Sequence, residues 1–182
     1  AISADGTHFA VGAVYAEDDS DASVGHVRVY ELSNDITASK LNLIAAGTTG
    51  TVTLSNTASI SGTGAEVKAA LVTDAVALGA QAKITVSDAV TAADAASIAS
   101  ATNATVAFTT GISDSLGNLA NNGSAESELT TVATDDPNVN ITISDSTTTM
   151  TAADLSAVTG ATTGTVTLTS AQTITGTGAQ VK

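Results

Sequence analysis

The chain contains no cysteine, no tryptophan, one methionine, two phenylalanines and two tyrosines in 182 residues. Without cysteine it can form no disulfide framework, thiol nucleophile or cysteine-ligated metal site. Because large aromatic side chains are so few, the core must be built from Ala, Val, Ile and Leu, with Thr methyl groups helping. Side chains of this size suit the close, regular stacking of similar layers better than an irregular globular core.

Basic residues are also scarce, since five Lys and Arg stand against 18 Asp and Glu and the net charge is −13. There is no basic patch to meet phosphates, so binding to nucleic acid or anionic lipid is not expected. No apolar run is long enough to span a membrane, so membrane insertion is not expected either. Together with the richness in Thr, Ser, Ala and Gly, these features favour an exported bacterial protein of the cell surface.

What the sequence does contain is a long internal repeat. Residues 36–68 and 150–182 align without a gap at a constant offset of 114, and 17 of the 33 aligned positions are identical. The matching parts include the phrases TTGTVTL and GTGA. A repeat over tens of residues indicates a solenoid, a propeller or an array.

Five short β-branched runs predict strands, because each carries two larger apolar residues two positions apart. Such spacing points one face of a strand inward. The first members are spaced 32, 22, 35 and 25 residues apart, a long–short alternation. We predict that these pairs lie in adjacent strands of one parallel sheet: Val52/Leu54, Ile84/Val86, Val106/Phe108, Ile141/Ile143 and Val166/Leu168.

Segments between these strands carry helix signals. Thr91-Ala-Ala-Asp94 and Thr151-Ala-Ala-Asp154 are helix-start patterns, in which the Thr side chain caps the first turn. Thr37 opens the corresponding segment of the first repeat copy, without the acidic residue. We therefore expect a short helix after each of these three threonines.

Two longer links follow Leu54 and Phe108. In the first, Thr63 and Glu66 form a capping box, and the apolar spacing predicts one helix through Leu78, ended by Gly79. The second is more polar, and we expect it to hold a broken helix followed by a loop at residues 135–137.

Strand and helix thus alternate at about 22 to 35 residues per step. The expected fold class is α/β: a repeat solenoid of short parallel strands and short helices over residues 35–182, with right-handed crossovers. An all-β solenoid or an array of sandwiches is the alternative. The Ala-rich segment 92–101 argues against it, because Ala favours helix.

Residues 1–34 have a different texture. Period-two alternation at Thr7–Val11 and His26–Tyr30 predicts strands, and Asp5-Gly6 is a tight-turn signal. The phrases Ser3–Gly6, Ala10–Ala13 and Gly25–Tyr30 make this segment resemble one FG-GAP-like (integrin-alpha-type) propeller repeat of large bacterial secreted proteins. The resemblance implies an antiparallel strand unit in which acidic loops hold calcium.

The candidate metal ligands are Asp18, Asp19 and Asp21, and calcium is the one candidate cofactor. They lack the regular alternation of that family's calcium loops. A second acidic cluster, Asp135–Asn140, also offers the oxygen ligands that Ca²⁺ prefers. For both clusters a solvated turn is the competing interpretation.

The repeat text itself is similar to the Thr/Ala/Gly-rich repeats of giant bacterial, often cyanobacterial, exoproteins. The phrases that carry this likeness are Ile60–Val67, Ile84–Asp88 and Thr162–Val166. The likeness implies a surface or matrix role and names no activity.

Other chemistry-bearing residues have plainer interpretations. Gly62-Thr63-Gly64 follows a strand and opens a helix, as in dinucleotide-binding proteins, but Val67 stands where a third glycine is needed, which favours a turn and helix cap. His8 and His26 are each expected on a strand, with no acid at ligand spacing. Single aspartates at the strand ends are expected to be caps or turn formers: Asp88, Asp114 and Asp145.

The sequence therefore predicts a structural repeat segment of a large secreted protein of the cell surface or extracellular matrix. We predict no catalytic residues and no enzyme activity. Calcium-dependent adhesion is the first alternative, and ice binding through Thr rows is ranked below it. Val181-Lys182 aligns with Val67-Lys68, inside a predicted helix. We thus expect further repeats of the same chain, or ends that associate head to tail with other copies, which makes filaments when the rotation does not close.

Overall fold

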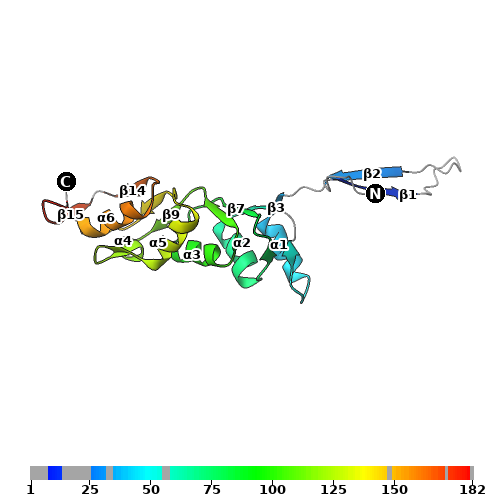
Figure 1. The fold of residues 1–182 in the computed structure, drawn as a ribbon, viewed down its shortest axis with the longest axis horizontal. Coiled ribbons are helices and arrows are strands. Elements are labelled where there is room, and N and C mark those ends of the chain that lie inside the picture. The colour runs from blue at the N-terminus through cyan, green and yellow to red at the C-terminus, as the bar shows by residue number, and fades with distance from the viewer. Residues whose placement is uncertain are drawn as a thin grey trace. The chain divides into compact units, whose positions relative to one another are not determined.

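The computed structural model describes residues 8–13, 26–31, 35–54, 58–146, 149–170 and 172–180. The chain divides into two compact units, Ala1–Asn34 and Asp35–Lys182 (Figure 1). In the first unit, strand β1 (His8–Ala13) pairs with β2 (His26–Glu31) in antiparallel orientation. The antiparallel pairing predicted for this segment is therefore confirmed.

Four helices of the second unit begin after a threonine, as the sequence predicts. Thr37, Thr63, Thr91 and Thr151 each have an extended backbone, and each hydroxyl oxygen accepts a hydrogen bond from the N–H three residues on. The hydroxyl thus satisfies one of the amides that a helix leaves unpaired at its start. The described residues form α1 (Ala38–Ala46), α2 (Gly64–Lys68), α3 (Ala92–Ser100), α4 (Leu116–Leu119), α5 (Ser127–Asp135), α6 (Ala152–Ala161) and a π-helical turn, η1 (Ala69–Thr73).

The strands of this unit are short and mostly parallel, in several small sheets. One sheet has the order β3 (Asp35–Thr37), β5 (Ser59–Gly62), β7 (Lys83–Val86), β8 (Thr105–Phe108), and another β9 (Ile112–Asp114), β12 (Ile141–Ile143), β14 (Val166–Leu168). Two parallel pairs are β4 (Thr53–Leu54) with β6 (Ala77–Leu78) and β13 (Thr149–Thr151) with β15 (Thr173–Thr175). The strands β10 (Ala120–Asn121) and β11 (Ser124–Ala125) pair antiparallel. The fold is thus mixed α/β, and the all-β alternative is wrong.

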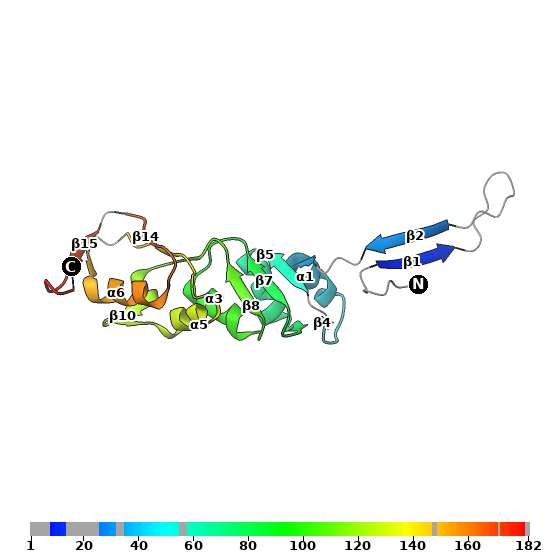
Figure 2. The same ribbon diagram turned by 45° about the horizontal axis from the view of Figure 1, so that its top comes forward.

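The prediction that five runs share one parallel sheet is also wrong. The strands β7 and β8 do lie side by side, next to β5 (Figure 2), but β12 and β14 form a separate sheet with β9, and β4 pairs with β6. The true neighbours include six short strands that lie outside these five runs: β3, β5, β6, β9, β13 and β15. Each carries one large apolar residue, too little for an alternating pattern to show.

Parallel partners lie at similar distances along the chain. Ile60 faces Ile84, 24 residues on, and the extremes are Ile84 with Val106 at 22 and Ile112 with Ile141 at 29. The long–short alternation seen in the sequence disappears once the six short strands are counted. We call each strand together with the helix that follows it a step.

The two copies of the internal repeat adopt matching structures. At the offset of 114, the elements β3, α1 and β5 correspond to β13, α6 and β15. The registers also correspond, since Ile36 faces Ile60 and Met150 faces Ile174. The same sequence pattern has therefore produced the same strand, helix and strand twice.

The helix predicted through Leu78 is shorter than expected. It continues from α2 into η1, where the Asp74 N–H donates to the Ala69 carbonyl oxygen, five residues back. Ala75 then has a positive φ of 50°, and the chain enters β6. Pairing of β6 with β4 satisfies the backbone at this point, so the helix ends before Gly79.

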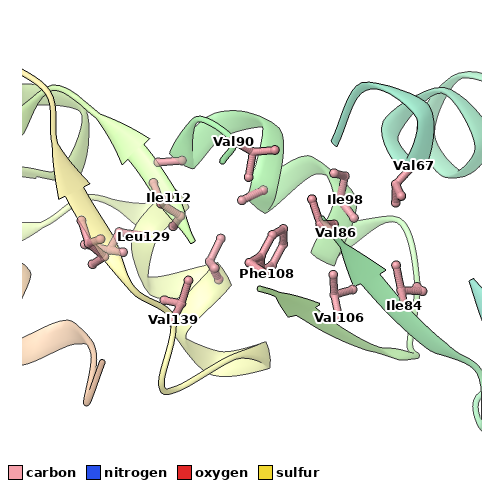
Figure 3. Close-up of a cluster of buried hydrophobic side chains, with 14 of the residues drawn as sticks. Val67, Ile84, Val86, Val90, Ile98, Val106, Phe108, Ile112, Leu129 and Val139 are labelled. Atoms are coloured by element: carbon pink, nitrogen blue, oxygen red, sulfur yellow. The ribbon is translucent and has the colours of Figure 1, made fainter. Parts of the chain in front are cut away.

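The core of the second unit is a continuous cluster of small aliphatic side chains between the helices and strands. Phe108 is 3% exposed and lies in the middle of the part drawn in Figure 3, among Val86, Val106 and Val139. Where neighbouring steps approach closely, only small residues fit between them. A Cβ on Gly64 would lie 2.1 Å from Cγ1 of Val90, so glycine is required there.

Candidate functional site

The predicted calcium ligands Asp18, Asp19 and Asp21 lie outside the residues that the structure describes. Calcium binding by them therefore stays a prediction. Among the residues that are described, no group of three or more His, Asp or Glu side chains is arranged to hold a metal ion.

The two histidines lie on strands, as predicted, but at opposite ends of the β1–β2 pair. His8 faces Glu31, and His26 faces Ala13, five register positions away. At about 3.4 Å per residue, their backbones are about 17 Å apart along the strands. The hairpin therefore does not bring them together as a metal-binding or catalytic pair.

The Gly62-Thr63-Gly64 segment is a helix cap, as predicted. Oε2 of Glu66 accepts hydrogen bonds from the Thr63 N–H at 2.9 Å and the Thr63 hydroxyl at 3.1 Å. The Gly64 N–H, which a phosphate-binding loop would offer to its ligand, donates instead to Oδ1 of Asp88 at 2.6 Å. A carboxylate of the chain itself thus occupies the place where a phosphate would bind.

This Asp88 contact is one of three alike. The others join Asp114 to Ala92 at 3.0 Å and Asp145 to Leu116 at 2.5 Å. In each, the aspartate follows a serine, and its carboxylate accepts the N–H of the first residue of an earlier helix. We call Asp88, Asp114 and Asp145 the aspartate caps.

Parallel pairing explains why the three contacts recur. Gly62 faces Val86, so two residues further on Gly64 faces Asp88. Likewise Val90 bridges Ile112, which sets Asp114 beside Ala92. A negative charge at a helix N-terminus is also favoured by the helix dipole. Each of the three aspartate caps therefore joins its own step to an earlier one.

Asp114 is the most enclosed of the three, with 8% of its surface exposed. Its Oδ2 accepts from Ala92, and its Oδ1 accepts from the Ser115 N–H at 2.8 Å and from Nδ2 of Asn118 at 2.7 Å. Both oxygens are thus engaged. A surface hollow beside it is also lined by Glu126 and Glu128.

The second acidic cluster closes the edge of a sheet. The last strand of the four-stranded sheet, β8, donates the N–H groups of Val106 and Phe108 to Oδ2 of Asp135 at 3.1 Å and of Asp136 at 3.0 Å. Nearby, Oδ1 of Asn140 accepts the Thr165 N–H at 2.9 Å. A solvated turn does not describe this cluster, because its side chains satisfy backbone amides of other segments. Calcium binding by it stays a prediction.

Burial raises the pKa of the Asp135 carboxyl group above its ordinary value. The hydrogen bond from Val106 opposes the rise, and the neighbouring charge of Asp136 adds to it. Asp135 thus carries its charge at a cost to folding, in order to cover the open edge of β8.

The sequence found these groups only in part. It predicted the aspartate caps as caps or turn formers, and that is confirmed, but each caps the helix 22 to 29 residues earlier rather than its own. The recurring Ser-Asp dipeptide was the available signal. No sequence signal pointed to the contacts of Asp135 and Asp136 with β8, because these residues and the strand come together only in the folded chain.

Comparison with protein-family models, curated proteins and solved structures found no match. In the part of the chain that the structure describes, no helix combines the length and apolar character needed to cross a membrane.

Proposed function

We propose that this chain is a structural repeat segment of a large secreted bacterial protein of the cell surface or extracellular matrix. In this proposal residues 35–182 are an α/β solenoid, and residues 1–34 are a separate antiparallel strand unit like one propeller repeat. The role of the chain is that of a spacer, which keeps the parts that it connects at a fixed distance and orientation. It is not an enzyme.

One observation carries the proposal: successive steps are joined by the same contacts. Parallel pairing at 22 to 29 residues recurs along the unit, and the aspartate caps repeat at the same register position. A fold in which each step contacts the next can be lengthened without redesign of its core. That property suits a spacer. The repeated strand, helix and strand are the trace that lengthening of the chain by internal duplication would leave.

The surface location is supported by composition and by the resemblance to exoprotein repeats. A net charge of −13 keeps the chain soluble and repels nucleic acid and anionic lipid. Its partners are then further repeats of the same chain or other copies of it, head to tail.

Small-angle X-ray scattering of the full chain tests the architecture. A stack of similar steps scatters as a rod, whose cross-section stays constant while its length grows with the number of steps. A second copy of residues 36–149, inserted between residues 149 and 150, should lengthen the particle and leave its cross-section unchanged. A particle that thickens instead would contradict the solenoid. Immunogold labelling of intact source cells tests the location, and label found only after permeabilisation would contradict it.

Calcium supplies the control for the rival function. A ligand that binds only the folded state must raise the melting temperature. If millimolar Ca²⁺ stabilises the wild type but not the variant Asp18→Asn/Asp19→Asn/Asp21→Asn, the adhesion alternative gains support. Equal melting temperatures with and without Ca²⁺ leave the spacer as the better explanation.

A further inference from the structure

The last described strand, β15, repeats the strand β5 in sequence and in structure. Ile174 corresponds to Ile60, and each faces the equivalent residue of the strand before it. Part of the capping box is reproduced as well. Oε1 of Gln180 accepts the Thr177 N–H at 2.9 Å and the Thr177 hydroxyl at 3.0 Å, as Glu66 does for Thr63.

The two strands differ in what covers them. Ile60 is 1% exposed, because β7 pairs with β5 on its far side and sets Ile84 against it. Ile174 is 41% exposed, and β15 is the terminal strand of its two-stranded sheet. All three residues of β15 are exposed. An apolar residue in an open strand edge is a template for pairing with another chain.

The internal copy shows what fits this edge. The segment that covers β5 reads Ile84-Thr85-Val86-Ser87-Asp88. Its apolar residues extend the core, and its aspartate accepts the N–H of Gly64. The residue equivalent to Gly64 is Gly178. The same five-residue pattern, as Ile-Thr-Ile-Ser-Asp, recurs at residues 141–145, where Asp145 caps the start of α4 in the same way.

We propose that the open edge of β15 binds a further strand that carries this Ile-Thr-(Val/Ile)-Ser-Asp pattern and enters parallel to β15. The incoming isoleucine lies against Ile174, and the aspartate four residues later faces the Gly178 amide. This inference rests on the proposed structural role and names the partner of this strand edge. The occupant is therefore a step of the same repeat type, recognised by backbone pairing, one apolar contact and one carboxylate.

The absence of cysteine makes the register directly measurable. The probe is a synthetic peptide with the sequence of residues 82–91, and in the β5–β7 pairing Ser59 faces Lys83 and Ser61 faces Thr85. The equivalent positions on β15 are Thr173 and Thr175. We expect the full-length variant Thr173→Cys to form a disulfide with the peptide variant Lys83→Cys, and Thr175→Cys with Thr85→Cys. Each matched pair should react about tenfold faster than either crossed pair, because a disulfide requires Cα atoms about 4.4–6.8 Å apart.

Two further variants test the contacts. Ile174→Asp in the chain should abolish the preference for matched pairs, whereas Ile44→Asp should retain it. Ile44 is a matched control because it is an apolar residue of α1 that is also half exposed, at 50%. In the peptide, Asp88→Ala should weaken capture, measured as the peptide concentration that gives half-maximal cross-linking.

Equal rates for matched and crossed pairs, or equal loss with Ile44→Asp, would overturn the proposal. So would a peptide of reversed sequence that is captured as well as the original. Scattering from the chain alone does not involve the peptide, so a constant rod cross-section with no peptide capture would reject this inference and leave the proposed function standing.

Discussion

The carboxylate of Asp114 accepts the backbone N–H of Ala92, 22 residues earlier in the chain, at 3.0 Å in a buried position. The contact joins two consecutive steps through a helix start, and Asp88 and Asp145 make the same contact with other helices. Strand pairing and helix capping are thus coupled. A change in one aspartate cap should weaken the joint between two steps rather than a single helix.

Replacing Asp114 tests this directly. Asp114→Ala should lower the free energy of unfolding by about 2–4 kcal/mol, because it leaves three buried or part-buried donors without their acceptor. Urea unfolding followed by circular dichroism measures the loss. Asp94→Ala is the control, since Asp94 forms a half-exposed ion pair with Lys68 and should cost less than about 1 kcal/mol. Equal losses of unfolding free energy for Asp114→Ala and Asp94→Ala would show that the cap contact stabilises the fold no more than a surface ion pair does.

The duplicated strands allow the same change at two equivalent positions. Ile60→Ala should destabilise the chain by about 2–5 kcal/mol, because Ile60 is buried between β3 and β7. Ile174→Ala should cost less than about 1 kcal/mol, since nothing covers the far edge of β15 among the described residues. Thermal unfolding of the monomeric chain compares the two. A cost for Ile174→Ala as large as that for Ile60→Ala would mean that the edge is already covered.

The two copies of the Gly-Thr-Gly-Ala segment provide a second matched pair. Thr63→Ala removes the acceptor for the Glu66 N–H at the start of α2 and should cost about 1 kcal/mol. Thr177→Ala removes the equivalent hydroxyl from an exposed turn and should be close to neutral. Chemical denaturation distinguishes them. A neutral Thr63→Ala would contradict the capping role.

The raised pKa of Asp135 predicts a pH dependence. A carboxyl group whose pKa is higher in the folded than in the unfolded state holds its proton more tightly when folded. Its contribution to stability is therefore greatest below the unfolded pKa of about 3.9 and declines as the pH rises through the folded value. Asp135→Asn keeps an oxygen acceptor for Val106 without the charge.

The expected outcome is that Asp135→Asn gains stability relative to the wild type as the pH rises from about 3.5 to 7. Denaturation midpoints of both proteins across this range measure the difference. Asp94→Asn is the control, and its difference from the wild type should not grow in that way. A wild type that gains relative to Asp135→Asn over the same range would show that the hydrogen bond outweighs burial.

Local signals predicted the helix starts well. Thr63, Thr91 and Thr151 cap helices as their spacing to an acidic residue suggested, because capping involves only atoms within one turn. The strands β1 and β2 were equally visible, since strong alternation needs no knowledge of distant segments, and their antiparallel pairing agrees with what the resemblance to a propeller repeat implied. The repeat at an offset of 114 likewise predicted that two parts of the chain would share a structure.

Strand neighbours were predicted poorly. The strand β15 holds a single isoleucine between hydroxyl residues, and that pattern is too weak to distinguish from a loop. The end of the helix after Thr63 failed for a related reason. There the pairing of β6 with β4 outcompetes the helical continuation that the apolar spacing suggested.

The sequence by itself determined the building materials: aliphatic and hydroxyl side chains, helix caps, and a pattern duplicated along the chain. Only the tertiary structure decided which strands are neighbours, which helix each aspartate caps, and that Ile60 is buried while its twin Ile174 is exposed. The physical reason is that a residue's local conformation depends on a few adjacent side chains. Its burial and its hydrogen-bond partner depend on whether another step, more than twenty residues away in the chain, lies against it.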